Sequence, residues 1–189
     1  MASDVLVVGA GGLGMSVVDA LEAAGRHTVV GFVDDRGPEL GPVLGLPILG
    51  RMSALEGLRS RHGLVVVALG DNQRRRAFAD LASALGFELL TVVHPRAVVS
   101  RHAHLAAGAL VMAGAVVGTC AQIGRCAIVN AGAVVDHHAR VGDFAHLGVG
   151  ACMAGGSELG FGAWLREGGA LRAGQVLLAE DLAQRHAAG

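Results

Sequence analysis

The chain has 189 residues, a formal net charge of −1, 30 glycines and only 3% aromatic residues. This length suits one or two domains, and the near-neutral charge argues against nucleic acid or an anionic membrane as the main partner. The sparse and odd set of cysteines, Cys120, Cys126 and Cys152, is typical of a reducing compartment, and the chain opens without an export signal. We therefore expect a cytoplasmic protein with free thiols.

The first 94 residues alternate short apolar runs with helical spacing, which predicts an α/β domain. A proline follows His94 and breaks this pattern, so we place the domain boundary there and expect domains at 1–94 and 95–189. The predicted parallel strands are Val5–Val8, Thr28–Val33, Leu64–Ala68 and Leu89–Val93, and the predicted helices are Met15–Ala24 and Arg74–Leu85.

The first predicted strand leads into Gly9-Ala10-Gly11-Gly12-Leu13-Gly14, which has the pattern G-x-G-x-x-G. The second strand ends in Asp34-Asp35 about twenty residues later, as in dinucleotide-binding folds. Glycines let the backbone approach a phosphate at a helix N-terminus, and the carboxylates can accept hydrogen bonds from a ribose or a base. Only about four strands fit before the boundary, so a nucleotide is a better ligand than a dinucleotide.

A second glycine turn, Leu69-Gly70-Asp71-Asn72, follows the strand at Leu64–Ala68. It is expected at the same carboxyl edge of the sheet, where open α/β sheets bind ligands. Asp71 and Asn72 can equally cap the helix that follows, so both interpretations of this turn stay open.

From Val99 to Leu177 every sixth residue is aliphatic, fourteen times in succession, and the residue four positions later is alanine in ten cases. No helix or ordinary strand period explains this spacing, which is typical of a parallel β-helix built from hexapeptides. About eighteen residues complete a coil, the aliphatic residue points inward and the small residue fits near a corner. The aliphatic residues are Val99, Leu105, Val111, Val117, Ile123, Val129, Val135, Val141, Leu147, Met153, Leu159, Leu165, Leu171 and Leu177.

The uncharged segment from Leu105 to Gly124 is long enough to cross a bilayer. It is largely glycine and alanine, however, and the six-residue register continues through it into Arg125. We therefore expect coils of the β-helix here and no membrane partner.

The clearest departure from the repeat is Asp136-His137-His138, where two histidines fall near a corner. The unperturbed pKa of an imidazole, roughly 6.5, suits general base catalysis near neutral pH. Most of the nine histidines are better interpreted as solvent-facing residues, among them His102, His104 and His186.

Taken together in this order, these features resemble the NeuD/PglD-type sugar acyltransferases, which join a small nucleotide-binding Rossmann-like α/β domain to an all-β left-handed parallel β-helix. The resemblance covers nearly the whole chain. It is carried by the first glycine loop, Asp34-Asp35, Ala68–Asn72, and the segment from Val129 through His146 to Gly155.

The resemblance implies transfer of an acetyl group from acetyl-CoA, without a metal, to an amine or hydroxyl of a sugar, often a UDP-linked 4-amino sugar. It also implies a homotrimer with active sites between neighbouring subunits. His137 matches the family's general base. The acetyl-CoA site is expected at His146, Gly155 and Glu167, and the nucleotide-sugar site at Gly11, Gly12, Leu13, Asp34, Asp35, Gly70 and Asn72.

The chain departs from the family pattern in three places. His138 stands where an Asp or Glu usually follows the catalytic histidine, and Leu13 stands where a histidine is common. The segment Ala179–Gly189 has helical character in place of the last coils and the proline-containing tail. Two alternatives therefore stay open: a non-catalytic nucleotide-binding trimer, and a zinc hydratase that uses His137, His138 and His146 with ligands from neighbouring chains.

Overall fold

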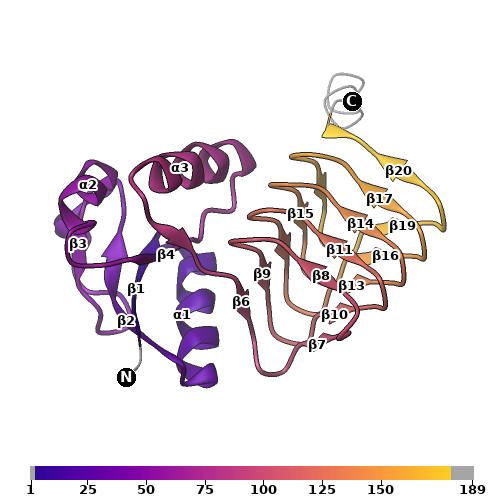
Figure 1. Cartoon of the computed structure of the whole chain (residues 1–189), viewed down its shortest axis with the longest axis horizontal. Helices are drawn as coiled ribbons and strands as arrows, with labels where there is room; N and C mark the ends of the chain where they lie inside the picture. Colours follow the sequence, from indigo (N-terminus) through magenta and orange to yellow (C-terminus); the bar gives the residue numbers. More distant parts are fainter. Residues whose placement is uncertain (1–2, 180–189) are drawn as a thin grey trace. The chain divides into compact units, whose positions relative to one another are not determined.

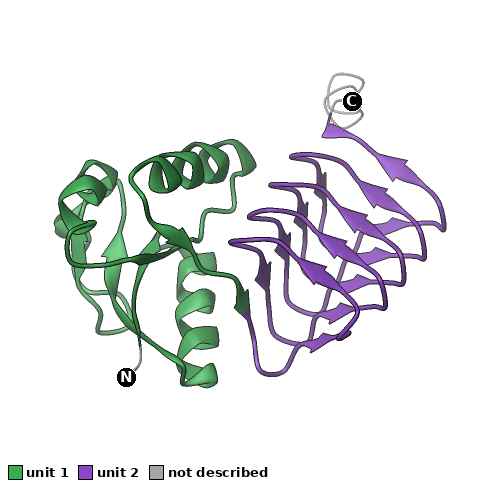
Figure 2. Cartoon of the chain, viewed as in Figure 1, with its two compact units in different colours: residues 1–92 green, residues 93–189 purple. Residues whose placement is uncertain are grey.

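The structure, a computed structural model, describes residues 3–179 (Figure 1). The chain divides into two compact units between Val92 and Val93, close to the boundary expected at His94 (Figure 2). Each unit is described by itself below.

The first unit contains a parallel sheet with the strand order β3-β2-β1-β4-β5 (Figure 1). The order changes direction at β1, which pairs with β2 on one side and β4 on the other. Ligands of open α/β sheets bind beyond the carboxyl ends of the strands at such a point. The strands are β1 (Ser3–Val8), β2 (His27–Val33), β3 (Ile48–Gly50), β4 (Leu64–Val67) and β5 (Glu88–Leu89); the helices are α1 (Gly12–Ala24), α2 (Leu55–Leu58) and α3 (Asn72–Ala84), with 3-10 turns at Pro38–Leu40 and Met52–Ala54.

The long elements agree with the sequence prediction, because β1, β2, β4, α1 and α3 all form at the expected places. The predicted strand 89–93 is wrong as a single element. It is divided into β5, which pairs with β4, and β6 (Val92–Val93), which belongs to a sheet of the second unit. An apolar run cannot show that its two ends pair with different sheets. β3 and α2 were not expected, since three or four residues are too short to establish a period.

The second unit is a left-handed parallel β-helix made of three five-stranded sheets. Residues eighteen positions apart pair from coil to coil, as Val116 pairs with Val98 and Val134. Face 1 contains β7 (Val98–Val99), β10 (Val116–Val117), β13 (Val134–Val135), β16 (Cys152–Met153) and β19 (Ala170–Leu171); face 2 contains β8 (His104–Leu105), β11 (Gln122–Ile123), β14 (Arg140–Val141), β17 (Glu158–Leu159) and β20 (Val176–Leu177); face 3 contains β6, β9 (Leu110–Val111), β12 (Ile128–Val129), β15 (His146–Leu147) and β18 (Trp164–Leu165).

The interior of the β-helix consists of the two residue series that the repeat predicts. The second residue of each strand points inward, and from Val111 to Leu159 these aliphatic side chains are almost completely buried. The alanines from Ala109 to Ala151, spaced by six, are buried beside them. Ser157 takes an alanine position, and its hydroxyl donates a hydrogen bond to the Ala154 carbonyl at 2.6 Å, which satisfies the buried polar group.

The residue before each buried small residue adopts the left-handed backbone conformation. Glycine occupies this position in most hexapeptides, for example Gly132, Gly150 and Gly156. Glycine has no Cβ and adopts positive φ at little cost. Four residues other than glycine occupy it nonetheless: Cys120 (φ 58°), Cys126 (φ 51°), His138 (φ 59°) and Phe144 (φ 57°).

The segment 105–124 forms coils of the β-helix, as its register predicts. None of the helices in residues 3–179 combines the length and apolar character needed to cross a bilayer. Cys120, Cys126 and Cys152 are free thiols.

A larger side chain at one of the buried alanines tests this account of the interior. Ala133→Leu should lower the free energy of unfolding by about 1–3 kcal/mol, because the added methyl groups have no space between coils. Ala173→Leu is the matched control, since Ala173 is exposed at a corner. Thermal and urea unfolding of the two variants measures the difference, and equal stabilities would contradict the packing described here.

Candidate functional site

The glycine loop after β1 is held in shape by its first and last glycines, Gly9 and Gly14. Gly9 has φ of +100°, and a Cβ there would lie 2.8 Å from the Ala68 carbonyl oxygen. A Cβ on Gly14 would lie 1.9 Å from the Gly9 carbonyl oxygen. Gly11 and Gly12 have open space around the equivalent point, and Gly11 is the N-cap of α1. The loop therefore presents backbone at the N-terminus of α1, where N–H groups and the helix dipole favour an anion.

Asp34 lies beneath this loop and fixes it. Its Oδ2 accepts hydrogen bonds from the Ala10 N–H at 2.8 Å and from the Arg36 guanidinium at 3.0 Å. Its Oδ1 accepts from the Arg36 N–H at 3.0 Å and from Arg36 Nε at 2.9 Å. Hydrogen bonds from Arg36 hold the pKa of the Asp34 carboxyl well below its usual range, against the opposing effect of burial. All four acceptor positions are occupied, so Asp34 supports the loop rather than offering a free oxygen to a ligand.

The second glycine turn forms the opposite side of the same cleft. Gly70 lines the cleft, while Asp71 caps α3 by accepting a hydrogen bond from the Arg74 N–H at 2.8 Å. The Asn72 Oδ1 accepts from Arg75, which is completely buried and also donates to the Leu69 carbonyl at 2.8 Å. Of the two interpretations of this turn, capping is the one that the Asp71 side chain shows.

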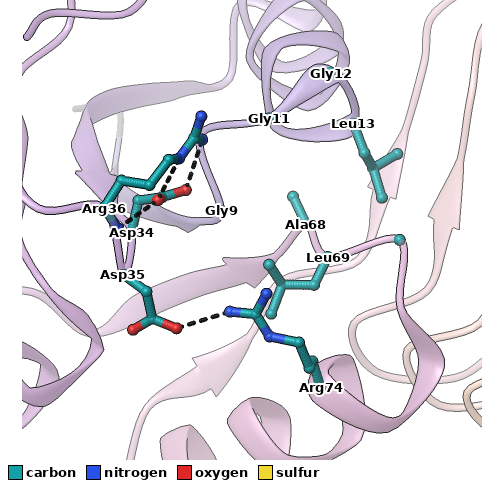
Figure 3. Close-up of a pocket in the computed structure, with 11 residues that line it drawn as sticks. Gly9, Gly11, Gly12, Leu13, Asp34, Asp35, Arg36, Ala68, Leu69 and Arg74 are labelled. Atoms are coloured by element: carbon teal, nitrogen blue, oxygen red, sulfur yellow. Dashed lines mark hydrogen bonds and ion pairs between the residues drawn. The ribbon is translucent and has the colours of Figure 1, made fainter. Parts of the chain in front are cut away.

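The cleft between the two turns has a volume of about 420 Å³. Asp35 and Arg74 approach each other across it at 2.7 Å, and both side chains are about half exposed (Figure 3). The negative charges of the two carboxylates in the cleft, Asp34 and Asp35, are balanced by the positive charges of Arg36 and Arg74. Sequence reasoning missed both arginines, although Arg36 directly follows the acidic pair. The lining residues are Gly9, Gly11, Gly12, Leu13, Asp34, Asp35, Arg36, Ala68, Leu69, Gly70 and Arg74.

In the second unit, His137 and Gly155 are brought together at the corner that leads from face 1 to face 2. They occupy equivalent positions in successive coils, eighteen residues apart. A Cβ on Gly155 would lie 2.7 Å from Nε2 of the His137 imidazole, so the ring fits only because residue 155 is glycine. The backbones of the two coils are also hydrogen-bonded at this corner, because the Gly156 N–H donates to the His137 carbonyl at 3.0 Å.

His137 itself is exposed and has two polar neighbours. Its Nδ1 lies 3.2 Å from Nδ1 of His138, and the two rings are nearly perpendicular. Asp136 accepts a hydrogen bond from the His137 backbone N–H at 2.7 Å, whereas its other oxygen lies 3.9 Å from Nε2. An imidazole in this setting can take a proton from a group in solvent.

His146 lies on face 3, which does not adjoin the His137 corner. It is buried, stacks on Trp164 with 4.7 Å between ring centres, and its Nε2 lies 3.3 Å from the amide nitrogen of Asn130. The Arg166 guanidinium lies 3.9 Å above the Trp164 ring. Glu167 follows β18 at the corner between faces 3 and 1, where its backbone passes close to Gly148. One chain therefore joins His137 with Gly155 and places His146 and Glu167 elsewhere on the β-helix.

No three His, Cys, Asp or Glu side chains within residues 3–179 are grouped so that they could hold a metal ion. His186 and most of the predicted C-terminal helical segment lie outside the described residues.

Removal of the Asp34 charge tests its role beneath the loop. Asp34→Asn should lower the stability of the first unit by about 2 kcal/mol at pH 7. Because folding lowers the pKa of Asp34, this contribution is fully present above the unfolded value near 4 and is lost as the pH falls below it. The variant should therefore lose less stability than the wild type between about pH 4 and pH 2.

Hydrogen exchange of the segment 3–33, measured at several pH values, reports this stability for the first unit alone. Asp35→Asn is the matched control, because the exposed pair with Arg74 is worth about 1 kcal/mol or less. Equal protection in the two variants at pH 7 would contradict the supporting role of Asp34.

Comparison with known proteins agrees with both units. Residues 4–82 match the family model of the PglD N-terminal domain. A histidine variant of perosamine N-acetyltransferase from Caulobacter crescentus, in complex with CoA and GDP-perosamine, is 36% identical with a TM-score of 0.90, over 95% of this chain and 85% of that chain. The acetyltransferase domain of PglB from Neisseria gonorrhoeae, in complex with acetyl coenzyme A, is 31% identical with a TM-score of 0.80, over 95% of this chain and 98% of that chain.

Among curated proteins no match was found. These two solved structures are nonetheless more than 30% identical to this chain over nearly its whole length, and their TM-scores of 0.90 and 0.80 show that they share its fold. The chain therefore belongs to the NeuD/PglD-type family of CoA-dependent sugar acetyltransferases.

Proposed function

We propose that the protein transfers the acetyl group of acetyl-CoA to the amino group of a nucleotide-linked amino sugar, with His137 as general base. The observation that carries this proposal is the full-length similarity to an N-acetyltransferase whose structure holds both CoA and GDP-perosamine. The cleft of the first unit and the His137 corner of the second supply groups of matching chemistry.

The reaction needs one base and one group that stabilises negative charge. The neutral amine of the acceptor attacks the thioester carbonyl carbon, and His137 Nε2 takes a proton from the amine nitrogen as the new C–N bond forms. The carbonyl oxygen gains negative charge and accepts a hydrogen bond from the Gly155 N–H. The C–S bond then breaks, and His137 returns the proton to the leaving thiolate of CoA. The exposure of His137 beside Gly155 supports these assignments.

The nucleotide diphosphate is assigned to the cleft of the first unit. Its phosphates would meet the backbone of Gly11 and Gly12 at the N-terminus of α1, together with the guanidinium groups of Arg36 and Arg74. Asp35 offers carboxylate oxygens, which only accept hydrogen bonds. Guanine presents two adjacent N–H donors, whereas uracil presents one donor between two carbonyl acceptors. We therefore propose a GDP-linked sugar, in place of the UDP-linked sugar that the family resemblance implied.

A homotrimer is proposed from the outward side chains of the β-helix. Those of face 1 are all apolar or small, namely Val98, Val116, Val134, Cys152 and Ala170, whereas four of the five on face 2 are polar, namely His104, Gln122, Arg140 and Glu158. Val98 is 64% exposed in the single chain. A second copy of the chain packed on face 1 would cover this surface, and we propose that its His146 then lies near the His137 corner. Such an arrangement would complete an acetyl-CoA site that one chain leaves divided.

The first test measures release of CoA thiol from acetyl-CoA with GDP-linked and UDP-linked 4-amino sugars. Wild type should turn over with the GDP-linked acceptor at the higher kcat/KM. His137→Ala should lower kcat by about 10²- to 10⁴-fold while CoA still binds. His104→Ala is the matched control, because His104 is an exposed histidine on face 2. Binding of nucleotide and CoA without any turnover would instead favour the non-catalytic nucleotide-binding trimer, and an undiminished rate in His137→Ala would exclude this base.

The trimer is tested by placing a charge on face 1. Val116→Glu should convert the protein to smaller species in analytical ultracentrifugation and lower its activity, because a buried unpaired carboxylate is costly at an interface. Gln122→Glu carries the same charge at the equivalent exposed position of face 2 and should leave the mass unchanged. A wild type that sediments as a monomer would rule out the assembly.

A further inference from the structure

The corner that carries His137 contains a second histidine in an unusual place. His138 occupies the left-handed position of its hexapeptide with φ of 59°, and the same corner has Gly156 and Gly174 in the two following coils. A histidine adopts this conformation at a cost that glycine does not incur. Cys120, Cys126 and Phe144 adopt the same conformation elsewhere in the β-helix, so the contacts of the His138 side chain decide whether it has a role.

The side chain of His138 meets the catalytic imidazole. The Nδ1 atoms of His137 and His138 lie 3.2 Å apart, within hydrogen-bond distance. Such a contact needs one ring to donate its N–H and the other to accept it, so the two imidazoles cannot both carry a proton at Nδ1. Each ring therefore fixes the tautomer of the other.

Asp136 does not form a hydrogen bond with the His137 ring and so does not fix its tautomer. It accepts the backbone N–H of His137, and its second oxygen lies 3.9 Å from Nε2, beyond hydrogen-bond distance and on the side of the ring that must face the acceptor amine. The neighbouring coils place Thr119 and Gly155 at the position of His137, and neither titrates near neutral pH. Among the described residues, His138 and Asp136 are thus the titratable groups that face His137.

We propose that His138 is a positioning residue, which as a neutral imidazole accepts the Nδ1–H of His137 and so leaves the lone pair of His137 on Nε2. The proposal rests on the proposed role of His137 as general base. When Nε2 takes the proton of the acceptor amine, the Nδ1–H stays on His137 and its hydrogen bond to His138 stabilises the imidazolium. A neutral acceptor stabilises that charge less than a carboxylate does, so the proton is readily returned to the thiolate.

The kinetic test compares two glycine variants. His138→Gly removes the acceptor and should lower kcat at least about tenfold, because His137 then also populates the unreactive tautomer, while KM for acetyl-CoA stays unchanged. Cys120→Gly is the matched control, since Cys120 occupies the same left-handed position one coil earlier with φ of 58°. It should leave kcat unchanged. His138→Asn should recover part of the rate, because its amide oxygen can accept the hydrogen bond and asparagine tolerates positive φ.

Two further measurements separate positioning from a structural effect. In ¹⁵N NMR spectra of the wild type at alkaline pH, His137 should be found as the Nδ1–H tautomer, and His138→Gly should shift it toward a mixture. In His138→Glu, the acidic limb of the pH–rate profile should move to higher pH, because a carboxylate favours the protonated imidazole. An Nε2–H tautomer in the wild type, or a His138→Gly variant with unchanged kcat and spectrum, would overturn the proposal.

These outcomes are distinct from failure of the proposed function. If His137→Ala retains the wild-type rate, His137 is not the base and the role of His138 fails with it. If His137→Ala is inactive while His138→Gly has the wild-type rate and pH profile, the assignment of His137 as the base is kept and only the positioning role of His138 is overturned.

Discussion

The hydrogen-bonded register between coils determines the geometry of the whole second unit. Each residue lies over the one eighteen positions before it, at the spacing of strands in a sheet of roughly 4.8 Å. At that spacing two large side chains cannot occupy the same corner in successive coils unless both point outward. The His137 ring lies where the next coil has Gly155, and the missing side chain of that glycine lets the imidazole lie directly against the backbone of the next coil.

The first unit reaches an ordered site by different means. Its glycine loop has no repeating neighbour to shape it, and one buried carboxylate performs that task. Asp34 binds the loop through the Ala10 N–H and binds Arg36 through both oxygens, and Arg36 in turn lines the cleft. The buried Arg75 fixes the second turn in the same way through two carbonyl groups. Charged side chains here hold backbone segments in place, and the glycine backbone and the exposed Arg36 and Arg74 line the cleft.

Much of the architecture could be predicted from the sequence, because it depends on periodicity. The six-residue register predicted the β-helix strands β7 to β20, though not β6, and the long apolar runs predicted β1, β2 and β4. The pairing of His137 with Gly155 also follows from counting eighteen residues. The functions of Asp34 and Arg75 could not be predicted, since each depends on contacts between loops that no local pattern encodes. A pattern of G-x-G-x-x-G followed by acidic residues is the same whether the first carboxylate contacts a ribose or supports the loop.

The eighteen-residue register also has a consequence for how such a protein can change in length. Insertion of one full coil leaves every later residue on the same face and at the same corner, so the prism grows along its axis and Gly155 stays on the corner of His137 even when the coil is inserted between them. Insertion of a single hexapeptide preserves the buried aliphatic and alanine series equally well. It nonetheless rotates everything that follows by one face, so that an insertion between residues 137 and 155, although neutral for folding, would move Gly155 to a different corner from His137.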